Sequence, residues 1–186
     1  VIGNHDVTTL TKAQFVDAAG MPGPNYSFDS GPIHGIVLDA NYRKDFTPYN
    51  AGNFNWTQTY VPPGELKWLE TDLKKTAGKT VVFIHQPLDD EKGAHGVKNA
   101  PEARRILERS GKVQAVFQGH NHKGAYHRIN GIHYFTMKAM VEGPGLKNNS
   151  YALARISARG VTVKGFVKQP DCPPSLRATT APAAKK

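Results

Sequence analysis

The stretch from residue 81 to residue 122 decides the fold, because it begins VVFIH at 81–85 and ends VQAVFQGHNH at 113–122. The apolar run that opens each segment is typical of a strand buried on both faces, as in a parallel sheet. Pro101, an amphipathic pattern and a stop at Gly111 predict a helix between the two strands. This order predicts an α/β fold in which each strand delivers histidine at its carboxyl end.

A third histidine loop lies at the start of the sequence, where Gly3, Asn4, His5 and Asp6 follow an apolar pair at 1–2. We interpret the apolar pair as the end of a strand, and we expect that the sequence begins inside a fold because no initiator methionine precedes it. Ligands gather at the carboxyl ends of strands in α/β sheets. The three histidine loops are therefore expected to meet at one edge of the sheet.

Local signals predict further helices and one irregular segment. A capping box at 11–14 predicts a short helix. A second helix should open at 62–64 and present one apolar face, made of Leu66, Leu69, Leu73 and Ala77. The residues at 41–61 follow no period, which predicts a long irregular excursion of a kind that often carries function.

Three hairpins are expected where two strand patterns flank a turn, at 26–38, 126–136 and 151–167. The folded domain should span residues 1–168. Residues 169–186 are rich in proline, alanine and lysine, and such a segment buries too little apolar surface to order, so we expect a disordered tail.

Composition excludes several classes of protein. With 186 residues, 39% apolar and 21% charged, the chain fits one ordinary globular domain. No apolar run reaches the roughly 18 residues of a membrane span. Cys172 is the only cysteine, which excludes an internal disulfide and a thiolate-rich zinc site. The net charge of +9 comes from scattered lysines and arginines, so nucleic acid is not expected as a partner, and part of the excess fits a site for anionic phosphate.

The residue types in the three loops suit a divalent metal ion. Neutral imidazoles and an amide oxygen bind Mn, Fe, Zn or Co without a thiolate. A single histidine at a strand end is more often a structural hydrogen-bonding group, but the shared position of the three loops favours a metal site. Gly3 and Gly119 are expected to let the backbone turn where a Cβ would be crowded.

In order and spacing, the segments 3–6 (GNHD), 83–88 (FIHQPL) and 119–122 (GHNH) resemble the last three of five motifs in the calcineurin-like metallophosphoesterases. The resemblance spans residues 1–168 and implies a four-layer α/β/β/α sandwich whose N-terminal strands are missing from this sequence. It also implies two divalent metal ions held between two sheets.

The same resemblance implies a role for each site residue. Asn4, His85 and His120 would bind one metal ion and His122 the other. His5 would contact the scissile phosphate and protonate the leaving oxygen, while Asp6 would orient the His5 imidazole. The alternative reading of Asp6 is a residue that caps its own loop.

The first two motifs of the family, an Asp-x-His and a Gly-Asp whose aspartate bridges the metals, have no counterpart in residues 1–186. Two dications about 3.5 Å apart repel by roughly 20 kcal/mol even at an effective dielectric of about 20, so bridging anions are needed. We therefore expect the chain by itself to hold at most one ion weakly and to lack phosphoesterase turnover.

Residues 124–143 resemble the manganese-dependent ADP-ribose/CDP-alcohol diphosphatase branch, which implies hydrolysis of a phosphodiester or pyrophosphate bond in a small nucleotide-like substrate. Class III cyclic-nucleotide phosphodiesterases, which share the three motifs, are the nearest enzyme alternative. A noncatalytic metal-binding or interaction module is the alternative from another class. The other histidines are expected to satisfy local hydrogen bonds rather than to act in the site; they are His34, His95, His127 and His133. The loop that carries Asp89, Asp90, Glu91 and His95 is expected to be solvated, and the alternative is that this loop borders the substrate.

Overall fold

The computed structural model describes residues 1–90 and 92–171, and its central feature is a six-stranded sheet with the order β1-β2-β3-β4-β6-β5. Strands β2, β3, β4 and β6 run parallel, and the edge strands β1 and β5 are antiparallel to their neighbours. The strands are β1 (Tyr26–Ser30), β2 (Ile33–Val37), β3 (Lys79–Phe83), β4 (Val113–Gln118), β5 (Ala125–Ile129) and β6 (Ile132–Thr136). The predicted parallel α/β core is confirmed.

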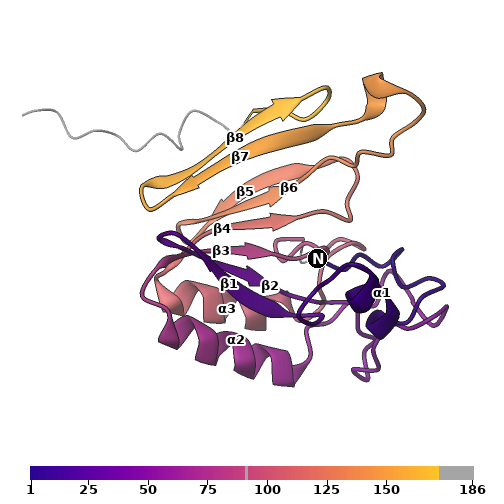
Figure 1. Ribbon diagram of the computed structural model, residues 1–186, viewed down its shortest axis with the longest axis horizontal. Coiled ribbons are helices and arrows are strands. Elements are labelled where there is room, and N and C mark those ends of the chain that lie inside the picture. Colours follow the sequence, from indigo (N-terminus) through magenta and orange to yellow (C-terminus); the bar gives the residue numbers. More distant parts are fainter. Residues whose placement is uncertain (91, 172–186) are drawn as a thin grey trace, which may run out of the picture.

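The two faces of the sheet are covered by different layers (Figure 1). Helices α2 (Pro63–Lys75) and α3 (Ala100–Ser110) cover one face and bury their leucines against β3 and β4. The hairpin of β7 (Tyr151–Ser157) and β8 (Gly160–Phe166) covers the other face, where Val161 and Val163 join a second apolar cluster with Phe135. The described residues thus form α, β and β layers, as expected for a metallophosphoesterase fold.

Most element boundaries follow from local sequence signals. Helix α1 (Lys12–Ala18) starts at the predicted capping box, in which the Thr11 side chain accepts a hydrogen bond from the Gln14 N–H. Helix α3 ends at Gly111, which adopts a left-handed φ of 64°. The β5–β6 turn at Asn130 and Gly131 has positive φ at both residues, 49° and 85°, as a two-residue hairpin turn of the Asn-Gly kind requires.

Two local expectations were wrong. The residues at 1–2 form no strand, because the Ile2 carbonyl accepts a hydrogen bond from the Asn41 side chain instead of a neighbouring strand, although Ile2 is fully buried. Helix α2 ends at Lys75, and Thr76 is already extended, so Ala77 lies outside the helix.

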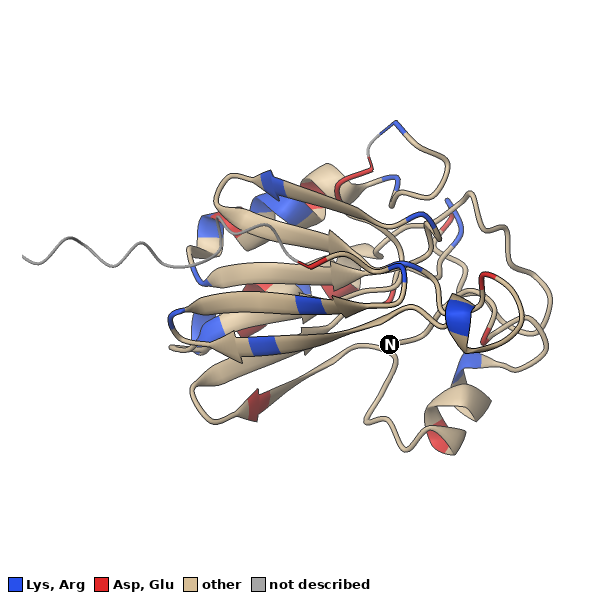
Figure 2. Cartoon of the chain, turned by 90° about the horizontal axis from the view of Figure 1, so that it is seen from above, with Lys and Arg blue, Asp and Glu red and all other residues tan. Residues whose placement is uncertain are grey.

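At the start of the expected tail, the Gln169 side chain accepts a hydrogen bond from the Lys138 N–H at 2.8 Å, and Asp171 pairs with Lys164 on β8 at 2.8 Å. The rest of that tail, residues 172–186 with Cys172, lies outside the described residues, as does Glu91. None of the helices in the described part of the chain is long and apolar enough to span a bilayer. Figure 2 shows lysine and arginine spread over helices, strands and loops.

Candidate metal centre

The histidine loops meet beyond the carboxyl ends of β3 and β4. Hydrogen bonding between the two chain segments continues past the strands, because the Ile84 N–H donates to the Phe117 carbonyl at 3.0 Å and the Gly119 N–H donates to the His85 carbonyl at 2.8 Å. This continued pairing places the rings of His85 and His120 side by side, with their centroids 5.2 Å apart.

The N-terminal loop reaches the same place from a distant part of the sequence. Asn4 is 1% exposed, and its Oδ1 lies 3.0 Å from Nε2 of His85. A Cβ on Gly3 would lie 3.2 Å from the His85 ring, so the expected crowding at Gly3 is confirmed. The cause is the close approach of the imidazole, since the φ of Gly3 is not positive.

The sharp turn of the last loop is made by His120 rather than by Gly119. His120 has a φ of 63°, a region that residues with a Cβ rarely adopt. A Cβ on Gly119 would meet the His85 ring at an ordinary 3.7 Å, so the expected need for glycine there is not supported. Strained non-glycine residues of this kind cluster at functional sites.

Burial keeps the paired imidazoles neutral. Desolvation, assisted by the nearby His120 and His5 rings, lowers the pKa of His85 to about 3. Desolvation and the neighbouring histidines also lower the pKa of His120 to about 4, despite a hydrogen bond from its Nε2 to the Trp56 carbonyl at 3.3 Å. Neutral imidazoles are the form that binds metal ions.

Two further predicted site residues, His5 and Asp6, line a hollow of about 340 Å³ together with Gly3 and His85. The Asp6 carboxylate accepts a hydrogen bond from the Gly3 N–H at 2.8 Å, which closes the loop on itself. Among the hydrogen bonds of the described residues, none joins Asp6 to the His5 ring. The hydrogen bond between Asp6 and the Gly3 N–H supports the interpretation of Asp6 as a residue that caps its own loop.

His122, the predicted ligand of a second ion, has a different environment. Its Nδ1 lies 2.7 Å from Oε1 of Glu142, and about half of each side chain is exposed. The imidazole of His122 is thus engaged by a carboxylate on the loop after β6. It does not share the close packing of His85 and His120.

The donors that meet beside His85 are neutral. Asn4, His85 and His120 offer neutral nitrogen and oxygen donors of the kind that hold Zn or Mn. In the part of the chain that the structure describes, no group of three or more His, Cys, Asp or Glu side chains could hold a metal ion. The carboxylate that lines the hollow, that of Asp6, accepts a hydrogen bond from the Gly3 N–H.

Aromatic residues that no sequence motif marks form one wall of this site. The ring of Trp56, in the irregular excursion, lies 6.0 Å from the His120 ring and 5.3 Å from the His95 ring. The His95 ring also lies 5.4 Å from the His120 ring, which favours the alternative that the loop carrying His95 borders the site. Phe54 lies 6.1 Å from His5. No sequence pattern marks these contacts, because the partners come from three separate loops.

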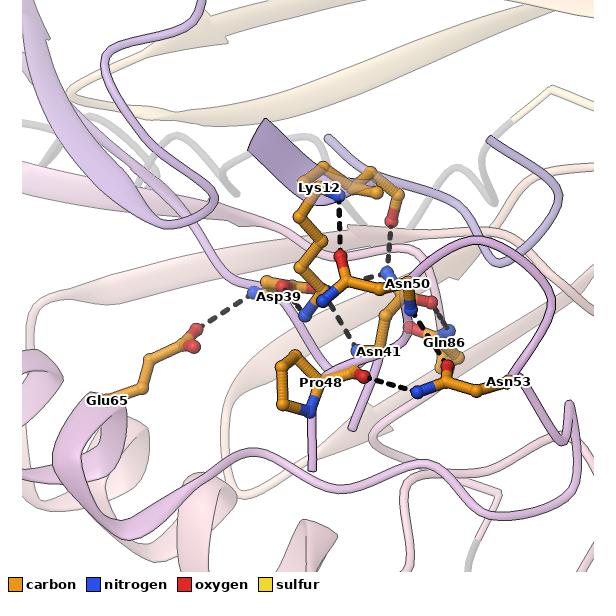
Figure 3. A network of polar contacts seen from close by, with 9 residues as sticks. Lys12, Asp39, Asn41, Pro48, Asn50, Asn53, Glu65 and Gln86 are labelled. Atoms are coloured by element: carbon orange, nitrogen blue, oxygen red, sulfur yellow. Dashed lines mark hydrogen bonds and ion pairs between the residues drawn. The ribbon is translucent and has the colours of Figure 1, made fainter. Parts of the chain in front are cut away.

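A buried polar network that no sequence signal predicts lies behind the site (Figure 3). Asp39 is fully buried and forms an ion pair with Lys12, whose own pKa is lowered by burial. The Asp39 N–H donates to Oε1 of Glu65 at 2.8 Å. Burial, together with the negative charge of Asp39, raises the pKa of Glu65 to about 8, so this carboxyl is mostly protonated at neutral pH.

Asn41 connects this network to both halves of the site. Its Nδ2 donates to the Ile2 carbonyl and to Oδ1 of Asp39, at 2.8 Å each. Its Oδ1 accepts from Nε2 of Gln86 at 2.7 Å. Because Ile2 precedes the Asn4 loop and Gln86 follows His85, one buried asparagine supports both loops. Figure 3 shows Asn41 with Gln86.

The remaining histidines have local partners, as expected. His133 accepts from or donates to the Tyr126 hydroxyl at 2.8 Å, and His34 lies between Asp29 and Asp72, at 2.7 Å from each. His127 pairs with Asp89 at 2.6 Å. The Asp89 side chain is only 2% exposed, so the prediction of a solvated loop is wrong at this residue.

Comparisons with known proteins bear on the whole fold. Among solved structures, a dimetal phosphatase from Danio rerio matches with a TM-score of 0.68 and 16% identity, over 91% of this chain and 69% of that chain. A putative 5'-nucleotidase from Staphylococcus aureus matches at 12% identity with a TM-score of 0.46, over 92% of this chain and 36% of that chain. The first likeness shows a shared fold, and the second is too low to carry an argument.

Among curated protein sequences, none matches significantly. The sequence model of the family described as calcineurin-like phosphoesterase matches residues 1–124, which are more than half of the chain and include all three histidine loops. The chain therefore belongs to the calcineurin-like phosphoesterase family, as its histidine loops and α/β sheet indicate.

Proposed function

We propose that the three histidine loops form a metal-dependent site that hydrolyses a phosphodiester or pyrophosphate bond in a small nucleotide-like substrate. The observation that carries the proposal is the convergence of Asn4 Oδ1 and His85 Nε2, 3.0 Å apart, beside the neutral ring of His120. These three side chains would hold one ion, and His122 would belong to the second. When bound, such ions polarise a phosphoryl oxygen and supply a hydroxide nucleophile at neutral pH.

In this proposal His5 provides the proton for the leaving oxygen. Its side chain is exposed and lines the hollow beside His85, so an imidazole there can reach a bound phosphate ester. Asp6 positions His5 indirectly, because its carboxylate accepts a hydrogen bond from the Gly3 N–H and so fixes the turn that contains His5. The net charge of +9 favours the approach of an anionic substrate.

We also propose that residues 1–186 alone do not turn over. The donors that converge are neutral, and the described residues bring no carboxylate cluster to them. A dinuclear centre then requires anionic ligands that the described residues do not bring to these donors. The same neutral donor set favours, as the second candidate, a noncatalytic module that binds a single ion.

Calorimetric titration of the chain with Zn²⁺ or Mn²⁺ tests the site. We expect at most one ion per chain, and we expect His120→Ala to abolish binding. His133→Ala is the matched control, because it removes a histidine that bonds to Tyr126 instead of the site. Unchanged binding in His120→Ala would refute the site.

A second measurement tests the chemistry. We expect no hydrolysis of bis-p-nitrophenyl phosphate by residues 1–186, and His120-dependent hydrolysis by the complete domain. Hydrolysis by the short chain that His120→Ala abolishes would disprove the expected inactivity. Absence of hydrolysis from the complete domain would favour the noncatalytic module.

A further inference from the structure

An exposed tryptophan stands directly beside the candidate metal centre. Trp56 is 42% exposed, yet its ring contacts both His95 and His120, and its backbone carbonyl accepts from His120 Nε2. Large apolar side chains at a rim are ordinary on a protein surface. The distinctive feature here is that one part of the ring packs on the site histidines while two fifths of the residue remains open to solvent.

The excursion that carries Trp56 is held in place by buried groups. Tyr49 is fully buried, and its hydroxyl lies within hydrogen-bonding distance of the carbonyls of Asn55 and Gln58, which flank the tryptophan. Asn55 also accepts from the N–H and the hydroxyl of Thr57, at 3.2 and 2.7 Å. The turn from 55 to 58 is thus fixed on both sides of Trp56.

The same excursion is tied to the loop that carries His95. The Lys98 N–H donates to the Thr59 carbonyl at 2.8 Å, and the Thr59 hydroxyl donates to the Gly96 carbonyl at 3.1 Å. Asn99 exchanges two hydrogen bonds with the backbone of Val61, at 3.0 and 2.8 Å. The two loops therefore form one wall, which presents Trp56 and His95 next to His120.

We propose that Trp56, backed by His95, is a stacking platform for a planar aromatic group of the substrate, such as a nucleobase, while the phosphate lies at the metal centre. A rigid indole offers a large apolar face at little cost in conformational entropy, and base–aromatic stacking tolerates any base because every base has a π-face. This platform rests on the proposed phosphoesterase site. It would favour substrates that carry a base over substrates that lack one, without selecting among the bases.

The two tryptophans of the chain make the platform directly observable. In a Trp68→Phe background, Trp56 is the only indole that reports fluorescence. We expect adenosine 5′-monophosphate to quench Trp56 and to bind at least about 5-fold more tightly than ribose 5-phosphate, the same phosphate without a base. Equal binding of the two ligands, without quenching, would overturn the platform and leave the phosphoesterase assignment standing.

Substitution of the tryptophan provides the second test, read by calorimetry. Trp56→Leu should weaken binding of the nucleotide by about 5- to 150-fold, the range seen for loss of base stacking, and leave ribose 5-phosphate within about twofold. Trp56→Phe should retain most of the nucleotide binding. Phe46→Leu is the matched control, because Phe46 is 40% exposed on the same excursion but its ring packs on Tyr60.

Failure of the phosphate site is distinguished by adenosine itself, which lacks a phosphate. If His120→Ala abolishes binding of ribose 5-phosphate and adenosine still quenches Trp56, both sites are supported. If ribose 5-phosphate binds the His120→Ala protein unchanged, the proposed function fails, and quenching by adenosine still decides the platform. Adenosine that never quenches Trp56 refutes the platform in either case, and the quenching assay does not require any Trp56 variant to fold.

Discussion

Two polar clusters are joined in the fold through the hydrogen bond between Asn41 and Gln86. They differ in charge and in exposure to solvent. The cluster around Asp39 contains an ion pair and is sealed from solvent, with the donors and acceptors of Asp39 and Asn41 paired inside the protein. The cluster around His85 is kept neutral by burial and borders an open hollow. A buried charge depends on its partner, because removal of one member of the pair leaves the other uncompensated, whereas neutral donors beside an open space are available to a ligand. The comparison assigns a scaffold role to the first cluster and a binding role to the second.

The largest effect should come from breaking the scaffold. Asp39→Ala leaves Lys12 buried without its carboxylate, which costs about 3–5 kcal/mol in the free energy of unfolding for a pair of this kind. Urea titration followed by circular dichroism measures the loss. Glu70→Ala is the control, because the Glu70–Lys74 pair is exposed and should contribute nothing measurable. A similar result for the two variants would remove the distinction between the clusters.

The next effect concerns the link between the clusters. Asn41→Ala removes the hydrogen bonds to Ile2 and Gln86, so the Asn4 and His85 loops lose their common support. Outer-shell partners of this kind typically change metal affinity by about 10- to 100-fold. We expect a fall of about 10-fold in Zn²⁺ affinity by calorimetry. Affinity equal to that of the His133→Ala control would show that the two clusters are independent.

A pH effect should arise far from both clusters, at His34. Although burial lowers its pKa, hydrogen bonds to Asp29 and Asp72 raise it above the ordinary value of 6.5. The stabilisation is therefore fully present below pH 6.5 and is lost as the pH rises through the raised pKa of the folded state. Unfolding free energies measured from pH 6 to pH 9 should fall in the wild type, and the part due to His34 should be missing in His34→Gln. Identical pH profiles would contradict this origin.

The smallest expected effect is in the number of protons that His85 and His120 release when a metal ion binds, which should be close to zero. Because the pKa values of His85 and His120 lie at about 3 and about 4, both imidazoles are already neutral above pH 6. Metal binding at pH 6.0 should then release almost no protons from them, unlike binding to histidines of ordinary pKa. Calorimetry in buffers of different ionisation enthalpy measures this number. Release of about one proton or more from these residues would show that an imidazole of the site is protonated before the metal ion binds.

Much of the candidate site could be predicted from sequence because its parts lie at strand ends. The runs that form β3 and β4 are apolar and short, and parallel strands bring the residues that follow them to one edge. The meeting of His85 and His120 follows from that rule. The approach of Asn4 to His85, across 81 residues of sequence, was expected because residues 1–2 were interpreted as a strand end, but those residues form no strand, and Ile2 is held by the Asn41 side chain instead. The site roles of these residues stay predictions until metal binding is measured.

The sequence by itself determined the elements and their order, because caps, turn residues and apolar periods act between neighbours in the chain. Thr11 begins α1, Gly111 ends α3, and Asn130 with Gly131 closes a hairpin through local backbone preferences. Only the tertiary structure decided that Trp56 and His95 border the metal centre and that Asp39 is buried with Lys12. Those contacts join loops without a repeating pattern, and their partners are chosen by the packing of the whole domain, which no short stretch of sequence encodes.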